Sequence, residues 1–181
     1  MKVPASVPSI ASERLDLVWM SGAFMEATLA GRFEEAQRII GAEFPAGWPD
    51  PDSTYWYGRR LKQMHDDPEE APWLTRVMLR RSDGAFIGSI GFHGKPNELG
   101  QAELGYGVEP GYRRQGYASE AALAMIDWAR REHGVRRFLL SISPTNAPSL
   151  GVAAKLGFQR IGTQIDEIDG EEYVFEMVFE G

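Results

Sequence analysis

The chain of 181 residues contains no cysteine. This excludes disulfides, cysteine nucleophiles and thiolate metal sites. It also fits a reducing compartment, so we expect a cytoplasmic protein. The only three histidines, His65, His93 and His133, are dispersed along the sequence. We therefore expect no histidine-built metal site.

Long apolar runs and an excess of positive charge are missing as well. No stretch approaches the roughly 18 apolar residues of a membrane helix, and residues 1–12 lack the apolar run of a signal peptide. The formal net charge is −7 and the pI about 5.0. Such a balance disfavours nucleic acid and anionic membranes as partners, and it is compatible with a cationic partner such as an amine.

Length and composition predict a single globular domain over residues 1–181. Hydrophobic residues make up 43% of the chain and charged residues 25%, which is ordinary for a soluble domain. No repeat or linker interrupts it, and residues 1–11 are expected to form a loosely ordered segment. Monomer and homodimer both stay open.

Apolar periodicity predicts a mixed α/β domain with helices on both faces of a central sheet. The expected strands are Arg14–Trp19, Trp73–Arg80, Ala85–Phe92, Gln101–Val108, Val135–Ser143, Arg160–Ile165 and Glu172–Phe179. The expected helices follow Ser21, run over Arg32–Ile40 after Gly31, extend from an Asp52 cap to about His65, span Ala118–His133, and run from an Asn146 cap to Leu156. Asp83-Gly84 and Asp169-Gly170 are the expected hairpin turns.

The segment Arg113-Arg114-Gln115-Gly116-Tyr117-Ala118 joins a predicted strand to a predicted helix. Glycine at such a junction lets backbone N–H groups converge on a ligand, and the helix dipole favours an anion there. The segment is neither a Walker A loop nor a GxGxxG fingerprint. Two alternatives stay open: the glycine relieves a tight turn, and the arginines are a solvated pair.

A second motif lies about thirty residues further on, where Asn146-Ala147-Pro148-Ser149 leads into Lys155-Leu156-Gly157-Phe158. Arg14-Leu15 and Glu103-Leu104-Gly105-Tyr106 occur earlier in the chain. With the glycine loop, these segments closely resemble the ribosomal-protein-alanine (Rim-type) branch of the GNAT superfamily of N-acetyltransferases. The resemblance extends from about Ser12 to Phe179 in the same order of elements.

The resemblance implies a mostly antiparallel mixed sheet in which the strand Gln101–Val108 splays from the strand Val135–Ser143. The pantetheine of acetyl-CoA would lie in that opening and pair with the first strand like an added β-strand, while the pyrophosphate would lie on the loop amides. The cofactor-binding residues implied are Val108, Glu109, Arg113, Arg114, Gln115, Gly116, Tyr117, Ala118, Asn146 and Ser149. Asn146 is also a good helix cap, so a purely structural role stays open.

Glu103 is the candidate base. Strand alternation places it on one face with Gly105 and Gly107, which leaves room for a ligand. Amines are largely protonated at neutral pH, so a positioned carboxylate, acting directly or through water, would help to remove the proton. The alternative is a solvated glutamate on a half-exposed strand.

The departing thiolate needs a proton donor. Many GNAT enzymes have a tyrosine four residues before the final Gly-Phe, where this chain has Ala153. In the Rim-type branch the serine of Asn-x-x-Ser is the proposed substitute, here Ser149, although this serine is equally suited to satisfying a helix N-terminus. For the oxyanion, the expected donor is a backbone N–H near Val108.

The function implied is an acetyl-CoA-dependent N-acetyltransferase that acts on a primary amine by direct attack in a ternary complex. The amine would be a protein N-terminus, a small amine or an amino-sugar. The alternatives are a non-catalytic acyl-CoA-binding module, which Ala153 favours, and a transferase of another acyl group such as succinyl.

Residues 21–65 and 93–100 are expected to wall the acceptor pocket. Possible lining residues are Trp48, Tyr55, Trp56, Tyr57, Phe92 and His93, of which at least half are expected in the core. The acidic runs at 66–70 and 166–172 either attract a cationic acceptor or form solvated turns.

Overall fold

The computed structural model describes residue 4, residues 6–168 and residues 170–180, and contains one eight-stranded sheet. The strand order is β1-β2-β3-β4-β5-β6-β8-β7. All neighbours are antiparallel except β5 and β6, which are parallel. The strands are β1 (Ile10–Ala11), β2 (Leu15–Trp19), β3 (Arg76–Arg80), β4 (Phe86–Phe92), β5 (Gln101–Val108), β6 (Arg137–Ile142), β7 (Gln159–Asp166) and β8 (Gly170–Val178).

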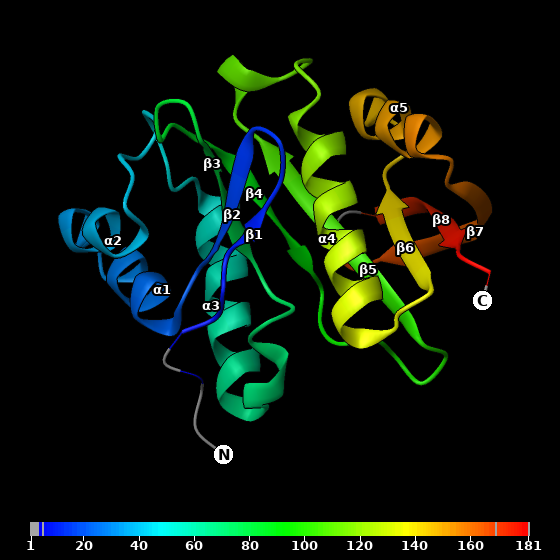
Figure 1. Ribbon diagram of the computed structural model, residues 1–181, viewed down its shortest axis with the longest axis horizontal. Helices are drawn as coiled ribbons and strands as arrows, with labels where there is room; N and C mark the ends of the chain where they lie inside the picture. The colour runs from blue at the N-terminus through cyan, green and yellow to red at the C-terminus, as the bar shows by residue number, and fades with distance from the viewer. Residues whose placement is uncertain (1–3, 5, 169, 181) are drawn as a thin grey trace.

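Five α-helices lie within the described ranges and cover both faces of the sheet (Figure 1). They are α1 (Gly22–Leu29), α2 (Phe33–Ile40), α3 (Pro51–Asp66), α4 (Tyr117–His133) and α5 (Ala147–Leu156), with 3-10 turns η1 (Pro68–Glu70) and η2 (Pro110–Tyr112). The expected mixed, mostly antiparallel α/β fold is therefore confirmed. None of the helices in this part of the chain is long and apolar enough to cross a membrane.

Strand alternation sorts the core into one cluster on each face. Leu15 and Leu17 of β2 are fully buried in the cluster beneath α4 and α5, where Ala122 and Met125 of α4 pack on them. The opposite cluster, beneath α1, α2 and α3, includes Val77 of β3. Burying one leucine contributes about 1.5–3 kcal/mol. The buried residues of β5 and β6, such as Leu104 and Phe138, belong to the cluster beneath α4 and α5.

The parallel strands β5 and β6 pair only at their beginnings. Gln101–Glu103 align with Arg137–Leu139, after which β5 continues on β4 alone and β6 on β8 alone. The strands thus part after Glu103, as expected, and we call the space beyond it the β5–β6 opening. Parallel strands end at the same edge of a sheet, so α4 and α5, which follow β5 and β6, both begin at the open end.

Several expected boundaries are wrong by two residues or more. β6 begins at Arg137 rather than Val135, and β8 begins at Gly170 rather than Glu172. Asp50, not Asp52, caps α3: its carboxylate accepts the Ser53 N–H at 2.6 Å. Pro51 occupies the first helical position, where its missing N–H costs no hydrogen bond. The strand expected from Trp73 begins instead at Arg76, because Trp73 N–H turns back to the Glu70 carbonyl at 2.9 Å.

The N-terminal segment includes a strand that the pattern did not predict. Ile10 and Ala11 pair with β2 as β1, and the Pro8 carbonyl accepts a hydrogen bond from the buried Arg76 guanidinium at 2.8 Å. Residues 1–3 and 5 of the segment expected to be loosely ordered, and Asp169 of the expected hairpin turn, lie outside the described residues.

At Gly88 the backbones of β4 and β5 leave no room for a side chain, and this close contact yields a prediction. Its φ is +156°, and an added Cβ would stand 2.1 Å from the Gly107 carbonyl oxygen. We expect Gly88→Ala to lower the free energy of unfolding by about 3 kcal/mol in urea denaturation. Gly58→Ala in α3, where an added Cβ meets nothing within 4 Å, is the control, with a gain of up to about 1 kcal/mol. Equal midpoints for Gly88→Ala and wild type would contradict this account of the strand contact.

Candidate active site

The loop between β5 and α4 presents backbone donors at the open end of the sheet. Gly116 precedes α4 with φ 84°, and Arg114 also has a positive φ of 62°. No side chain in the described part of the chain caps the first turn of α4. Its amide N–H groups are therefore left for a ligand, and the helix dipole favours an anion there.

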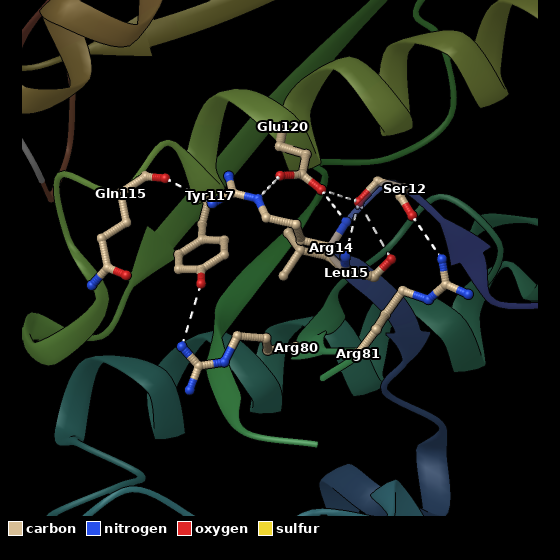
Figure 2. Close-up of polar contacts among 8 residues, drawn as sticks. All are labelled: Ser12, Arg14, Leu15, Arg80, Arg81, Gln115, Tyr117 and Glu120. Carbon is tan, nitrogen blue, oxygen red and sulfur yellow. Dashed lines mark hydrogen bonds and ion pairs between the residues drawn. The ribbon is translucent and has the colours of Figure 1, made fainter. Parts of the chain in front are cut away.

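Arg14 reaches this loop from the start of β2 and fixes its shape (Figure 2). Its Nη1 donates to the Gln115 carbonyl at 3.1 Å, and its guanidinium lies 4.4 Å from the Tyr117 ring centroid. A Cβ added at Gly116 would lie 3.5 Å from Arg14 Nη2. Arg14 thus holds a loop carbonyl on its own side of the loop and packs against the residue that begins α4.

Glu120, in the first turn of α4, anchors Arg14 (Figure 2). Its carboxylate accepts Arg14 Nε and the Arg14 backbone N–H, each at 2.7 Å, and the Ser12 hydroxyl at 2.7 Å. Partial burial raises the pKa of Glu120, but the hydrogen bonds from Ser12 and Arg14 lower it further, so the net shift is downward. Arg80 adds a long contact of 3.4 Å to the Tyr117 hydroxyl.

The side chains of the loop point in different directions. Arg113 turns back to β5, where its Nε donates to the Val108 carbonyl at 2.9 Å, while Arg114 and Gln115 are exposed. Tyr117 is buried and Ala118 is half-buried. Backbone amides, rather than a cluster of cations, are therefore the main feature this loop offers an anion.

On the strand side, Val108 and Glu109 differ in the direction of their backbone groups. The Glu109 N–H donates to the Ile87 carbonyl of β4 at 2.9 Å. Because these directions alternate along a strand, the backbone groups of Tyr106 and Val108 face the β5–β6 opening. Burial, followed by the Asp50 carboxylate, raises the pKa of Glu109, with Arg113 opposing.

Ser149 and Tyr106 meet at this opening. Asn146 Oδ1 accepts the Ser149 backbone N–H at 3.2 Å, so Asn146 does cap α5 and the Ser149 hydroxyl is not the cap. Burial raises the pKa of Tyr106, and the neighbouring Ser149 side chain opposes this. No hydrogen bond of normal geometry joins them, and the buried Tyr106 oxygen has no partner among the described residues. An orphaned buried hydroxyl of this kind suits a ligand that brings its own polar groups.

Glu103 is the last residue of β5 that pairs with β6, so the β5–β6 opening begins here. Its pKa is lowered mainly by His93, against the effect of burial, and further by the Ser141 hydroxyl. Gln164 Nε2 donates to Ser141 Oγ at 3.0 Å, which leaves the Ser141 proton for the carboxylate. Glu103 is therefore held ionised.

A cleft of about 930 Å³ opens beside Glu103, and a smaller one of about 270 Å³ lies over Gly105–Gly107. The larger is lined by six carboxylates and by three side chains that are always cationic. These are Asp66, Asp67, Glu70, Glu103, Asp166 and Glu172, with Arg59, Arg60 and Lys62. The acidic runs at 66–70 and 166–172 thus contribute to a cleft that attracts cations.

The expected aromatic residues divide between core and cleft. Trp48, Tyr57 and Phe92 pack in the two clusters, with Tyr57 and Phe92 also bordering the smaller cleft. Trp56 and His93 line both clefts, and Tyr55 is exposed beside Arg59. No group of three or more histidine or acidic residues suited to hold a metal occurs in the ranges described.

Residues 23–159, about three quarters of the chain, match the model of the acetyltransferase (GNAT) domain. The chain belongs to the GNAT acetyltransferase family. The loop of residues 113–118, the β5–β6 opening and Glu103 lie within the matched residues, and the expected family resemblance is confirmed.

Known GNAT proteins resemble the chain in sequence and in fold. It is 28% identical over 127 residues to the uncharacterized N-acetyltransferase YjdG of Bacillus subtilis, covering 68% of this chain and 74% of that one. The ribosomal-protein-S5-alanine acetyltransferase of Vibrio fischeri has a TM-score of 0.63 at 18% identity, covering 94% and 96%. RimL, a ribosomal L7/L12 alpha-N-protein acetyltransferase in complex with coenzyme A, has a TM-score of 0.64 at 16% identity, covering 94% and 98%. The two solved structures show the fold that this GNAT chain shares with them.

Sequence reasoning assigned no role to several residues of this GNAT site. Arg14, Ser141 and Gln164 contact it from distant parts of the chain. Arg14 belongs to a segment that carries the family resemblance, but its contact with the loop is not evident from that segment, and no motif marks Ser141 or Gln164. Tyr106 could have been found from the sequence. It lies two residues before Val108 on the same strand, which places both side chains on one face of that strand.

The anchoring of Arg14 by Glu120 predicts a pH-dependent stability. Because the folded-state pKa of Glu120 is lowered, its stabilisation is complete above the ordinary glutamate pKa and is lost as pH falls through the folded value. We expect Glu120→Gln to lower the free energy of unfolding by about 1–2 kcal/mol at pH 7. The difference from wild type should shrink below about pH 4.3.

Urea denaturation at pH 7 and at acidic pH measures both effects. Glu35→Gln is the matched control, because Glu35 pairs with Arg32 on the exposed surface and should cost less than about 0.5 kcal/mol. A Glu120→Gln effect as small as the control, or one that grows in acid, would contradict the anchoring role.

Proposed function

We propose that this protein is an acetyl-CoA-dependent N-acetyltransferase that moves an acetyl group to a primary amine by direct attack in a ternary complex. One observation carries the proposal: β5 and β6 part immediately after Glu103. The opening therefore extends from the uncapped start of α4 to a carboxylate on the rim of an acidic cleft. A donor and an acceptor would meet at Glu103 from opposite sides.

The donor side fits coenzyme A. The pyrophosphate would lie on the amides of residues 113–118, in a loop shaped by Arg14. The pantetheine would lie in the β5–β6 opening and pair with the backbone of Val108, near Asn146 and the orphaned Tyr106 hydroxyl. Acetyl-CoA is the donor that family membership implies, and RimL was solved with coenzyme A.

The acceptor side fits an ammonium group. The carboxylates of the larger cleft raise the local concentration of a cation, and ionised Glu103 draws a proton from it, directly or through an intervening group. A protein N-terminus, a small amine and an amino-sugar all carry such a group. Two structures of similar fold belong to acetyltransferases of ribosomal proteins, which supports including N-terminal peptides among the acceptors tested.

The remaining steps fall to groups at the opening. The Val108 N–H would stabilise the developing oxyanion, and the Ser149 hydroxyl would give the thiolate its proton. Ala153 is fully buried in the core, so the position of the usual tyrosine donor holds no polar group. This same residue favours the second candidate, a module that binds acyl-CoA without turnover.

Release of free coenzyme A tests the proposal. We expect acetyl-CoA to be consumed with one class among N-terminal peptides, polyamines, amino acids and amino-sugars. A thiol reagent detects the product without background, because the chain has no cysteine. Succinyl-CoA as donor tests the alternative acyl group. Binding of acetyl-CoA with no thiol release for any amine or donor would contradict the proposal and favour the binding module.

Glu103→Gln separates enzymatic transfer from spontaneous acetylation. We expect a loss of about 100-fold or more in kcat/KM, with the affinity for acetyl-CoA unchanged in calorimetry. Glu98→Gln, at an exposed glutamate of the neighbouring loop, is the matched control. An unchanged rate in Glu103→Gln would remove Glu103 from the chemistry.

A further inference from the structure

His93 follows β4 directly and lies across the glycine face of β5. Its Nδ1 is 3.6 Å from Glu103 Oε2. Its Nε2 lies over Gly105, where an added Cβ would be only 2.7 Å away. The ring therefore occupies the space that the missing side chain of Gly105 leaves free, with one nitrogen toward the carboxylate and the other over the strand.

The main chain of His93 is fixed independently of its ring. Arg60 Nη1 and Gln63 Nε2, both from α3, donate to the His93 carbonyl at 2.9 Å each. The His93 N–H donates to the Glu103 carbonyl at 2.8 Å. The His93 side chain remains 46% exposed, against 30% for Glu103, so the more accessible of the two groups is the imidazole.

His93 also lies on the boundary between the two clefts. It lines both the acidic cleft beside Glu103 and the cleft over Gly105–Gly107. An amine held in the acidic cleft would therefore lie beside this ring as well as beside Glu103. Glu103, in contrast, lines only the larger cleft.

We infer that Nε2 of His93 is the atom that takes the proton from the acceptor amine, and that Glu103 is a positioning residue acting through the imidazole. This inference rests on the proposed function, in which it makes His93 rather than Glu103 the group that first accepts the proton. With Nδ1 facing a carboxylate, the proton of the neutral ring resides on Nδ1 and leaves Nε2 as the acceptor. The imidazole is more exposed than the carboxylate and borders both clefts, so it is the more accessible base for an incoming amine.

The step balances as follows. The nitrogen lone pair forms the C–N bond to the thioester carbon while the carbonyl π pair moves to oxygen, and an N–H proton moves to Nε2. Collapse restores C=O and breaks the C–S bond, whose electron pair leaves on sulfur and takes up a proton. The products are the amide and the thiol of coenzyme A. The imidazolium returns its proton to water, and an acceptor that arrives as an ammonium ion releases one proton more.

Several charged groups belong to the pH dependence of His93: Glu103, Arg60 and Glu70 lie close to it, and Arg59, Lys62, Asp66, Asp67, Asp166 and Glu172 line the same cleft. Glu103 lies beside the ring and Arg60 contacts its carbonyl. Glu70 of η1 accepts the Lys95 backbone N–H at 2.7 Å, close to Gly94. Variants at His93 and Glu103 leave the other charges in place, so a changed pH profile reports the pair itself.

The pH profile of kcat/KM tests the inference, measured with an acceptor amine that is already neutral between pH 5 and 8. Wild type should lose rate in acid, as the group that accepts the proton becomes protonated. We expect His93→Gln to lose about 100-fold or more in kcat/KM and to show no further fall in rate at acidic pH. Glu103→Gln should also lose rate but should keep the fall at acidic pH. His65→Gln, at an exposed histidine of α3, should match wild type.

Gly105→Ala provides a second test that leaves both side chains in place. The new Cβ would force the ring away from its position. Gly105→Ala should therefore lower the rate when His93 is present, and should cause no further loss when it is combined with His93→Gln. Acetyl-CoA affinity and thermal midpoint show that each variant is folded. Two results would overturn the inference alone: a His93→Gln variant that reacts at the wild-type rate, or a fall in rate at acidic pH that disappears only in Glu103→Gln. A wild type that releases no coenzyme A with any amine would overturn the proposed function as well.

Discussion

The parting of β5 and β6 after Glu103 is the constraint on which the rest of the site depends. A parallel pair held together along its whole length would satisfy its own backbone groups and leave no space between the strands. Here each strand is instead held by an antiparallel neighbour, β5 by β4 and β6 by β8. The sheet remains intact while its middle opens, and the helices that follow both strands begin at that open end.

The opening brings two environments of opposite electrostatic character to one carboxylate. At the open end, the uncapped start of α4 offers amides and a positive dipole, in a loop shaped by Arg14. Beside Glu103, the larger cleft has an excess of carboxylates. An anionic donor and a cationic acceptor would thus be attracted from different sides. His93 lies beside Glu103 and borders both clefts, which is why we infer that the proton passes there.

Sequence patterns predicted the features that depend only on neighbouring residues, such as the ends of a strand or the turn that precedes a helix. The bounds of β5 were predicted to the residue, because alternation and flanking turn residues mark both ends, and Gly116 was recognised from its place between strand and helix. The start of α3 was misplaced by two residues, because Asp50 and Asp52 are both good caps and only the position of Pro51 decides between them.

The long-range contacts were not predictable in the same way. Arg14 meets Glu120 across more than a hundred residues, and Ser141 meets Glu103 only because β5 and β6 are parallel neighbours. The sequence showed Glu103 as a carboxylate with free space beside it. The structure shows that the ring of His93 occupies part of that space, which a single sequence does not indicate.

Hydrogen–deuterium exchange with and without coenzyme A tests the central claim most directly, because it locates binding in the backbone. The account predicts slower exchange at the amides of residues 104–108 and 113–118 and at the start of α5, with α1 and α2 unchanged. Protection confined to other segments, or none at ligand concentrations that saturate binding in calorimetry, would contradict a site in the β5–β6 opening.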